Sequence, residues 1–290
     1  MKILVIGKSG QLARSLDALK EGRELTFLSR AEADLSFPEK TEEALRSKEF
    51  DVLVNAAAYT AVDAAETDRE AAEAVNAAAP GLLAQICAER GALMIHISTD
   101  YVYDGSASLP LSEDAPVAPC GVYGATKAAG ELAVRASGAQ HLILRTSWLY
   151  NAEGKNFVNT MLRLGETRSS LRVVFDQIGC PTYSVDLAEA VYALIDAYAE
   201  RGAEDFPLGT YNFANEGVAS WYDLACAVFE MSGMQREVVP VRSSEFPSPA
   251  KRPAYSVTDK AKIKDTFGIK IRHWRKALRD CLAEKKLKST

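Results

Sequence analysis

"KILVIGKSGQLARSL", residues 2–16, is the stretch of the sequence that decides the fold. An apolar run of strand length leads into the pattern G-x-x-G at Gly7 and Gly10, and an amphipathic helix is expected from about Gln11. Glycines at such a turn let the backbone approach a pyrophosphate, whose charge is met by the N–H groups at the helix amino end. Ala13 stands where a third glycine is usual, so the motif alone leaves an ordinary strand-to-helix turn as the competing interpretation.

The same alternation continues along the chain. Further apolar runs are "LTFLS", "DVLVNAA", "ALMIHIS", "HLILRTS" and "LRVVF", and segments with helical periodicity lie between them, at 41–48, within 67–90, from about 123, near 157–167 and near 185–200. Near-continuous apolar strands that alternate with helices predict an α/β fold, a doubly wound, Rossmann-like parallel sheet with helices on both faces.

The rhythm changes from about residue 209, where a proline-rich segment and a basic helical tail follow. We therefore expect a dinucleotide-binding domain formed by 1–148 and about 169–208. A smaller C-terminal substrate-binding portion would be formed by about 149–168 and 209–290. Ligands of open α/β sheets bind beyond the carboxyl ends of the strands, between two such parts.

Composition limits the partners. The 290 residues carry a net charge of −5 from interspersed acids and bases, so no basic stripe is present to bind nucleic acid. No stretch approaches the length of a membrane span, and the apolar run at the amino terminus is too short for a signal peptide, so we expect a cytoplasmic protein with no membrane partner. The five cysteines contain no C-x-x-C pair and the three histidines share no ligand spacing, which predicts neither a disulfide framework nor a metal site.

The end of the second strand predicts the cofactor. A carboxylate here would hold the adenosine ribose and favour NADH, but "LSRAEADLS" offers Ser29 and Arg30 instead. A guanidinium suits a 2′-phosphate, so we expect NADPH, with NADH as the alternative. Asp34 and Leu35 are expected to flank the adenine. A solvated surface charge remains the competing interpretation of Arg30.

"GVYGATK", residues 121–127, places Tyr123 and Lys127 four positions apart, on one face of an expected helix. "ISTDYVYDG" ends an apolar strand 24 residues upstream of Tyr123, so Thr99 is expected to meet Tyr123 at the crevice. A hydride delivered to a carbonyl leaves an alkoxide that needs a proton, and a tyrosine can supply it when a nearby cation stabilises its phenolate. Thr99 would donate a hydrogen bond to the same oxygen.

The chain resembles the dTDP-4-dehydrorhamnose reductases, a family of extended short-chain dehydrogenase/reductases. The resemblance runs from residue 7 to about 256 through the segments "GKSGQL", "VNAAAYTAVDAAE", "HISTDYVYDG", "VYGATKAAGE", "LRTSWLY", "NFVNTMLRL", "FDQIGCPT", "ASWYDLA" and "SPAKRPAYS". Their combination in this order is far more specific than any one motif.

The resemblance implies roles for individual residues. The cofactor phosphates would lie against Gly10, Gln11 and Leu12, and the nicotinamide-side ribose against Ala58, Tyr59 and Thr60. Thr99, Tyr123 and Lys127 would form the catalytic triad, with Tyr123 as the proton donor. The substrate pocket would include Thr99, Asp100, Tyr101, Trp148, Asn156 and Arg252. Trp148 would pack on the deoxysugar and Arg252 would meet the diphosphate, although core packing for Trp148 and a solvated side chain for Arg252 remain open.

The activity that the resemblance implies is reduction of the C4 keto group of dTDP-4-dehydro-β-L-rhamnose to dTDP-β-L-rhamnose, the last step of dTDP-L-rhamnose biosynthesis for surface polysaccharide. Some members of the family form dimers linked by magnesium, so a homodimer is one expectation, and no metal-binding glutamate cluster is identified here. Two alternatives remain: another nucleotide-sugar reductase or epimerase of this fold, and a non-catalytic NADP-binding subunit resembling the regulatory β subunit of methionine adenosyltransferase.

Overall fold

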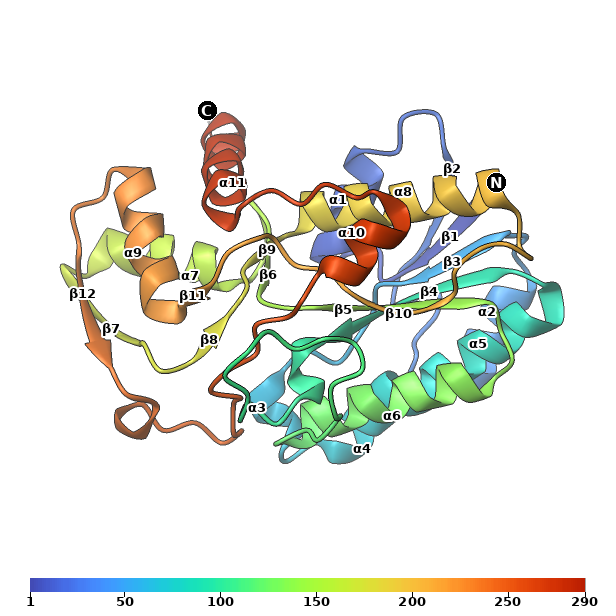
Figure 1. Ribbon diagram of the computed structural model, residues 1–290, viewed down its shortest axis with the longest axis horizontal. Coiled ribbons are helices and arrows are strands. Elements are labelled where there is room, and N and C mark those ends of the chain that lie inside the picture. Colours follow the sequence, from blue (N-terminus) through green and yellow to red (C-terminus); the bar gives the residue numbers. More distant parts are fainter. Residues whose placement is uncertain (290) are drawn as a thin grey trace.

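A six-stranded parallel sheet forms the centre of the computed structural model, which describes residues 1–289. Its strands are β1 (Lys2–Ile6), β2 (Glu24–Leu28), β3 (Val52–Asn55), β4 (Leu93–Thr99), β5 (His141–Thr146) and β10 (Gly209–Asn212). They lie in the order β10-β5-β4-β3-β1-β2 (Figure 1). The expected doubly wound parallel sheet is confirmed.

Helices cover both faces of this sheet (Figure 1). One face carries α1 (Gln11–Ala18), α8 (Ser184–Arg201) and α10 (Ala261–Phe267), and the other carries α2 (Pro38–Arg46), α5 (Ala79–Arg90) and α6 (Val122–Ala136). Along β1, Ile3 and Val5 pack toward the first group, whereas Leu4 and Ile6 pack toward the second. Burial on both faces explains why the strands are apolar at nearly every position.

Several short elements connect the long ones. Between β3 and β4 the chain forms α3 (Val62–Ala65), α4 (Arg69–Glu73) and a π-helical turn, η1 (Ala74–Ala78), which runs directly into α5. Two 3₁₀ turns follow later, η2 (Asp100–Val102) and η3 (Ser243–Glu245). Within residues 1–289, none of the helices is both long and apolar enough to cross a membrane.

A smaller lobe stands beside the sheet (Figure 1). It contains α7 (Phe157–Thr167), α9 (Trp221–Ser232) and α11 (Trp274–Ser289), with β7 (Ser170–Val174) paired in parallel to β12 (Glu237–Val241). Two short ladders complete it, β6 (Leu149–Tyr150) with β9 (Thr182–Tyr183) and β8 (Ile178–Gly179) with β11 (Ala219–Ser220). Its core includes Val158, Leu224, Phe229 and Leu278.

Two strands pair with a different part of the molecule from the one to which the expected ranges assign them. β10 belongs to the central sheet although it lies in 209–290, because Tyr211 packs into the core beneath α8. β7 belongs to the smaller lobe although it lies in 169–208, because Leu171 and Val173 pack against α7 and α9. The division into two domains stays a prediction.

The sheet order creates a crevice at one place. From β1 the chain moves outward to β2, whereas β3 lies on the opposite side of β1, so the connections leave the carboxyl ends of β1 and β3 in different directions. Ligands of open α/β sheets bind at this topological switch point. The segments after Ile6, Asn55 and Thr99 all lie at this edge of the sheet.

A buried ion pair joins α6 to β5. The guanidinium of Arg145 donates two hydrogen bonds to the carboxylate of Glu131, of 2.9 and 2.7 Å, and a third to the hydroxyl of Tyr103 at 2.9 Å. Burial raises the pKa of Glu131, but its hydrogen bonds and the charge of Arg145 outweigh burial and hold this pKa below its usual value. The pair therefore stabilises the fold above the ordinary carboxyl pKa and less as the pH falls.

Replacing Arg145→Met is expected to lower the free energy of unfolding by about 3 kcal/mol near neutral pH, because Glu131 would stay buried with only the partly exposed Arg135 and the hydroxyl of Ser98 as partners. Burial would then raise the pKa of Glu131, so the deficit should shrink as the pH falls and the carboxyl takes up a proton. Urea unfolding at several pH values measures this effect. The double variant Arg145→Met/Glu131→Gln should lose less stability than the single one, and equal losses would refute the explanation.

Candidate active site

The glycine turn after β1 lies against the segment that follows β3. Gly7 has a φ of +101°, and a Cβ at this position would lie 3.1 Å from the N, Cα and Cβ atoms of Ala57. Gly10 precedes α1 as its N-cap, where it has no side chain to cover the helix end, and its N–H donates to the carbonyl of Gly7 at 2.8 Å. The turn therefore brings bare backbone to the crevice, as a phosphate cradle requires.

The first residues of α1 face different surroundings. Gln11 donates its Nε2 to the carbonyl of Leu149 at 3.2 Å, and its Oε1 accepts a hydrogen bond of 2.9 Å from Asn156. Leu12 and Ala13 are buried in the core shared with α8. A cofactor could therefore meet Leu12 only through its backbone. Ala13 occupies the third glycine position because its methyl group fills the space between α1 and the sheet.

Asn156 connects the glycine turn with the smaller lobe. Its Oδ1 accepts from the N–H of Asn159 at 2.9 Å and so caps α7. Its Nδ2 donates to Gln11 and to the carbonyl of Asn151, both at 2.9 Å. Both ends of the amide are thus engaged within the protein, and the expected contact with substrate stays a prediction.

The end of β2 holds the residues expected near the adenosine. Arg30 is 80% exposed at its side chain and donates its Nε to Asp34 at 3.1 Å, so its guanidinium is open to a ligand. Leu35 is buried in the core. Glu32, which the sequence analysis does not single out, accepts hydrogen bonds from the N–H and hydroxyl of Ser29 at 2.9 and 2.6 Å. A carboxylate therefore does stand here, beside the arginine.

The segment 58–60 after β3 is held by one buried amide. Asn76 accepts from the N–H of Tyr59 at 2.9 Å and donates to the carbonyl of the same residue at 3.1 Å. It also donates to the hydroxyl of Thr126 on α6 at 3.2 Å. Asn76 lies in the π-helical turn η1, and such turns are frequent near functional sites. The only sequence signal was an asparagine inside an otherwise small and apolar helical segment.

Thr99 and Tyr123 meet at the end of β4. The hydroxyl of Thr99 lies near the phenol of Tyr123, whose pKa it acts to lower, and it donates to Asp100 at 3.1 Å. The ring of Tyr101 stands edge-on to that of Tyr123, with 5.5 Å between centroids. Lys127 follows one helical turn later and is buried, with its ammonium donating to the carbonyl of Ile97 at 2.7 Å. The structure thus brings the three residues of the expected triad to one end of β4.

Burial sets the proton affinities of this group. It raises the pKa of Tyr123 to about 12, the hydrogen bond with Thr99 acts against this, and the charge of Asp100 adds to it. Burial lowers the pKa of Lys127 to about 8, with Glu131 acting against it. From the sequence, Lys127 is expected to depress the pKa of Tyr123. In the structure this pKa is raised instead, because burial of the phenol outweighs the effects that lower it. A protonated Tyr123 is the form that can donate a proton.

Asp100 is a buried carboxyl that can accept a further hydrogen bond. Only 1% of its surface is exposed, and among residues 1–289 its Oδ2 has no hydrogen-bond partner. Burial raises its pKa to about 6, and hydrogen bonds with Ser256 and Thr99 act against this rise. An unpartnered carboxylate oxygen beside Thr99 is suited to accept a hydrogen bond from a ligand hydroxyl.

Two carboxylates, Asp63 in the short helix α3 and Glu66 directly after it, hold the surroundings of Tyr123. Glu66 accepts from the N–H of Val122 at 2.9 Å, at the first residue of α6. Asp63 accepts from Arg252 at 2.8 Å, and Arg252 is also hydrogen-bonded with Tyr101. The spacing of three residues puts both acids on one face of α3, which the sequence "VDAAE" could have indicated.

An aromatic pair forms the side of the site toward the smaller lobe. Trp148 stacks on Trp221, with 3.6 Å between ring centroids and 6° between planes. Trp148 has a φ of +48°, and Gly179 is required beside it because a Cβ there would lie 2.8 Å from the indole. Trp221 also donates its Nε1 to Gln177 at 3.2 Å. Trp148 is predicted from the sequence as a site residue, whereas Trp221, within "ASWYDLA", is not.

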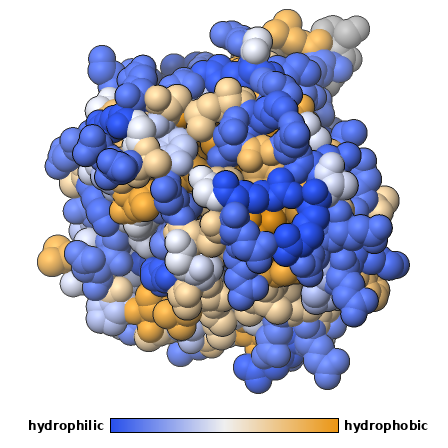
Figure 2. All heavy atoms as spheres, turned by 90° about the vertical axis from the view of Figure 1, so that its right-hand side faces the viewer, coloured by the Kyte–Doolittle hydropathy of each residue, from blue (hydrophilic) through white to orange (hydrophobic). Residues whose placement is uncertain are grey.

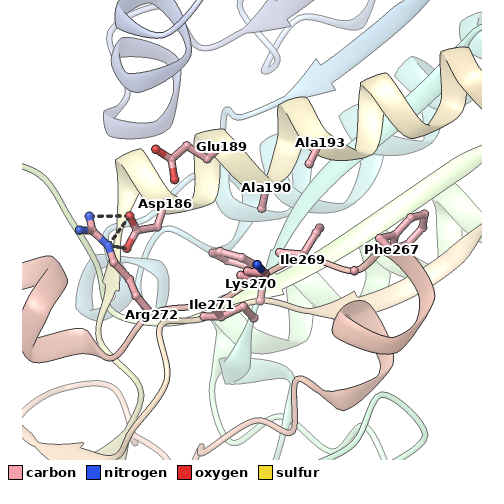
Figure 3. Close-up of a pocket in the computed structure, with 11 residues that line it drawn as sticks. Asp186, Glu189, Ala190, Ala193, Phe267, Ile269, Lys270, Ile271 and Arg272 are labelled. Atoms are coloured by element: carbon pink, nitrogen blue, oxygen red, sulfur yellow. Dashed lines mark hydrogen bonds and ion pairs between the residues drawn. The ribbon is translucent and has the colours of Figure 1, made fainter.

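A cavity of about 420 Å³ lies elsewhere, between α8 and the segment 267–272. Asp186 and Arg272 form an ion pair at its edge, and Glu189 and Lys270 also line it (Figure 3). None of the expected site residues lines it.

On the face opposite the smaller lobe, apolar side chains form small patches separated by hydrophilic ones (Figure 2). Across residues 1–289, no three His, Cys, Asp or Glu side chains gather as a metal site would require.

The chain is similar to known proteins over its whole length. The family model described as RmlD substrate binding domain matches residues 1–287. A dTDP-4-dehydrorhamnose reductase of Burkholderia thailandensis is 43% identical, over 98% of this chain and 99% of the relative. The crystal structure of a dTDP-4-dehydrorhamnose reductase from Clostridium acetobutylicum has a TM-score of 0.93 at 38% identity, over 99% and 100% of the two chains.

A third relative was solved with a nucleotide. It is the dTDP-4-dehydrorhamnose reductase of Bacillus anthracis in complex with NADP, with a TM-score of 0.91 at 33% identity, over 98% of this chain and 100% of the other. The match of the family model, the identity of the relatives and the shared fold agree along nearly the full chain. This chain therefore belongs to the dTDP-4-dehydrorhamnose reductase family of extended short-chain dehydrogenase/reductases.

Proposed function

We propose that this protein is an NADPH-dependent reductase that converts the C4 keto group of dTDP-4-dehydro-β-L-rhamnose to the alcohol of dTDP-β-L-rhamnose. The observation that carries the proposal is the placement of Thr99 beside the buried phenol of Tyr123 at the carboxyl end of β4, next to the topological switch point. Membership of the family and the relative solved with NADP support the substrate and the cofactor. The product would serve dTDP-L-rhamnose biosynthesis.

The residues at the switch point fit a dinucleotide. A side chain at Gly7 would collide with Ala57, so the turn is kept clear for close backbone contact, and α1 begins directly behind it. The positive end of the α1 dipole and the turn would hold the pyrophosphate. Arg30 would meet a 2′-phosphate with its exposed guanidinium, and Glu32 would have to share that space. A bound NADPH would supply the hydride.

Tyr123 acts as the acid of the reaction. Its raised pKa keeps the phenol protonated, so it can donate its proton to the C4 oxygen as negative charge develops there. Thr99 lies within hydrogen-bonding reach of Tyr123 and stabilises the same oxygen. Lys127, charged below about pH 8, supplies positive charge on the same face of α6 and so favours the phenolate that remains.

The substrate would lie between the smaller lobe and β4. The Trp148 indole offers a flat apolar wall to the methyl group of a 6-deoxy sugar, and Trp221 stacks behind it. Asp100 would accept from a sugar hydroxyl through its unpartnered oxygen. Arg252 would meet the diphosphate by exchanging its ion pair with Asp63 for the ligand.

The two alternative functions predict a different fate of the bound cofactor. An epimerase of this fold would return its cofactor to the starting redox state, whereas a reductase releases it oxidised. A regulatory subunit would bind NADP without turnover. The buried proton donor and its partners at β4 favour an enzyme over a binding subunit, because a binding protein has no need of a desolvated acid at this place, and the family of the chain favours a reductase over an epimerase.

Tyr123→Phe tests the proton donor. The variant is expected to lose at least about 100-fold in kcat, because general acid catalysis contributes this much or more, while its affinity for NADPH changes little. Initial rates with the keto-sugar nucleotide and a fluorescence titration with NADPH measure the two effects. Tyr198→Phe is the matched control, since it removes a hydroxyl that donates to Gln140 at the amino end of β5, away from Thr99 and Tyr123. Unchanged turnover in Tyr123→Phe would refute the assigned role.

Arg30→Ala tests the recognition of the 2′-phosphate. The KM for NADPH is expected to rise about tenfold and the KM for NADH to stay the same, because only NADPH would lose a charge-assisted hydrogen bond. Initial rates with both cofactors measure this change. Arg14→Ala provides a control, because Arg14 is also on the surface but pairs with Glu153. Equal shifts for both cofactors would remove the case for phosphate recognition at Arg30.

A further inference from the structure

A buried row of polar side chains joins Lys127 to His96 and Asn55, two residues that have no part in the roles proposed so far. Lys127 places its Nζ 3.3 Å from Nε2 of His96, and Nδ1 of His96 lies 3.1 Å from Nδ2 of Asn55. Each of these three side chains is at most 1% exposed. The row runs from α6 through β4 to β3, so it crosses the switch point under the crevice.

The row has one more hydrogen-bond donor than the imidazole of His96 can accept from. Burial, and then the charge of Lys127, lower the pKa of His96 well below its usual value, so the imidazole is neutral and has one donor and one acceptor nitrogen. Asn55 accepts at its Oδ1 from the N–H of Ala57 at 3.3 Å, which turns its NH₂ group toward Nδ1. A charged Lys127 faces Nε2. Two donors therefore face an imidazole with one lone pair to offer.

Only a charged Lys127 is limited to donating, whereas a neutral Lys127 can also accept, and the arrangement in which it accepts is then favoured because it keeps the bond from Ala57. When Lys127 is charged, it donates to Nε2, Nδ1 carries the hydrogen, and Asn55 must turn its amide so that Oδ1 accepts from Nδ1. Ala57 then loses its acceptor. When Lys127 is neutral, Nε2–H donates to Nζ, and Asn55 keeps its bond from Ala57. A half-turn of an amide exchanges oxygen and nitrogen without changing its shape, so both arrangements fit the same space.

We propose that His96 and Asn55 are positioning residues that couple the charge of Lys127 to the backbone N–H of Ala57. Ala57 is the residue against which Gly7 packs, so the coupling reaches the turn that would hold the pyrophosphate. Since coupling is reciprocal, a change at this turn would also change the proton affinity of Lys127. The coupling itself stands on the geometry of the row, and its effect on catalysis rests on the function proposed above.

The Lys127 ammonium is in hydrogen-bonding contact with His96 and the carbonyl of Ile97, and the other charged or titratable groups nearby have other partners. On α6, Glu131 accepts from Arg145, Arg135 and Ser98, and the phenol of Tyr123 lies near Thr99. Directly after β4, Asp100 accepts from Thr99 with one oxygen, and at the start of β5 the Nδ1 of His141 lies 2.8 Å from the carbonyl of Ala139. His96 is thus the neighbour whose donor and acceptor pattern can change with Lys127.

The test follows the tautomer of His96 by long-range ¹H–¹⁵N correlation in the full-length protein, which has only three histidines. We expect the hydrogen on Nδ1 well below about pH 8, where Lys127 is charged, and on Nε2 well above it. His141→Gln and His273→Gln assign the signals. A single tautomer of His96 across this range would overturn the coupling.

Two variants separate the partners. In Asn55→Asp both carboxylate oxygens are acceptors, so His96 should keep its hydrogen on Nδ1 at every pH. In Lys127→Met only the NH₂ group of Asn55 remains, so the hydrogen should stay on Nε2. A change of tautomer with pH in either variant would contradict the proposed row. The wild-type spectra remain decisive if a variant does not fold.

The kinetic arm uses the pH profile of kcat/KM for the keto-sugar nucleotide. The alkaline limb of the wild type should lie near pH 8, where Lys127 loses its charge. In Asn55→Asp this limb should move up by about one to two pH units, the effect of one additional hydrogen bond to a charged group. His273→Gln, at a side chain that contacts Gly217 and Trp274 and none of the row, should leave the profile unchanged. If the protein has no reductase activity but His96 still changes tautomer with pH, the proposed function is refuted and the coupling stands. If the protein is active but the alkaline limb does not move in Asn55→Asp, the coupling is refuted.

Discussion

The site depends on one constraint, the common edge at which the buried parallel strands end. Ile6 is paired with Asn55, Asn55 with His96, and Thr99 with Thr146, so the segments that follow β1, β3 and β4 leave the sheet side by side. The glycine turn, the segment held by Asn76 and the Thr99–Tyr123 pair consequently share one crevice, although they are widely spaced in the sequence. Hydride transfer needs such an arrangement, because cofactor, substrate and acid must meet without reorganisation.

Burial acts on four ionisable groups here with three different results. Glu131 and Arg145 keep their charges because they satisfy one another inside the fold. Asp100 has no such partner, so burial moves its pKa up to about 6. Lys127 has only neutral acceptors, so its pKa falls to about 8. The same loss of solvent thus makes one pair structural and leaves the two groups near the crevice able to change their charge close to neutral pH.

The strands and most helices could be predicted because burial on both faces leaves a continuous apolar signal, and the turn at Gly7 because close packing against Ala57 permits no side chain. The positions of Tyr123 and Lys127 could be predicted because their spacing puts both on one face of α6, and that of Thr99 because it ends a strand at the same edge of the sheet. Asn76 and Trp221 could not, because each acts through a contact between segments distant in the sequence. β10 was misplaced for a similar reason, since a four-residue strand shows its membership only through its partner β5.

The central claim is that this site moves a hydride from NADPH to C4 of a keto-sugar nucleotide while Tyr123 supplies the proton. Its most direct test uses NADPH carrying deuterium at the nicotinamide C4 position, with dTDP-4-dehydro-L-rhamnose as substrate, and locates the label by NMR of the product. Deuterium at C4 of dTDP-L-rhamnose, with one oxidised cofactor released per sugar, is the predicted result. A product without deuterium at C4, or a sugar changed while the cofactor stays reduced, would contradict it.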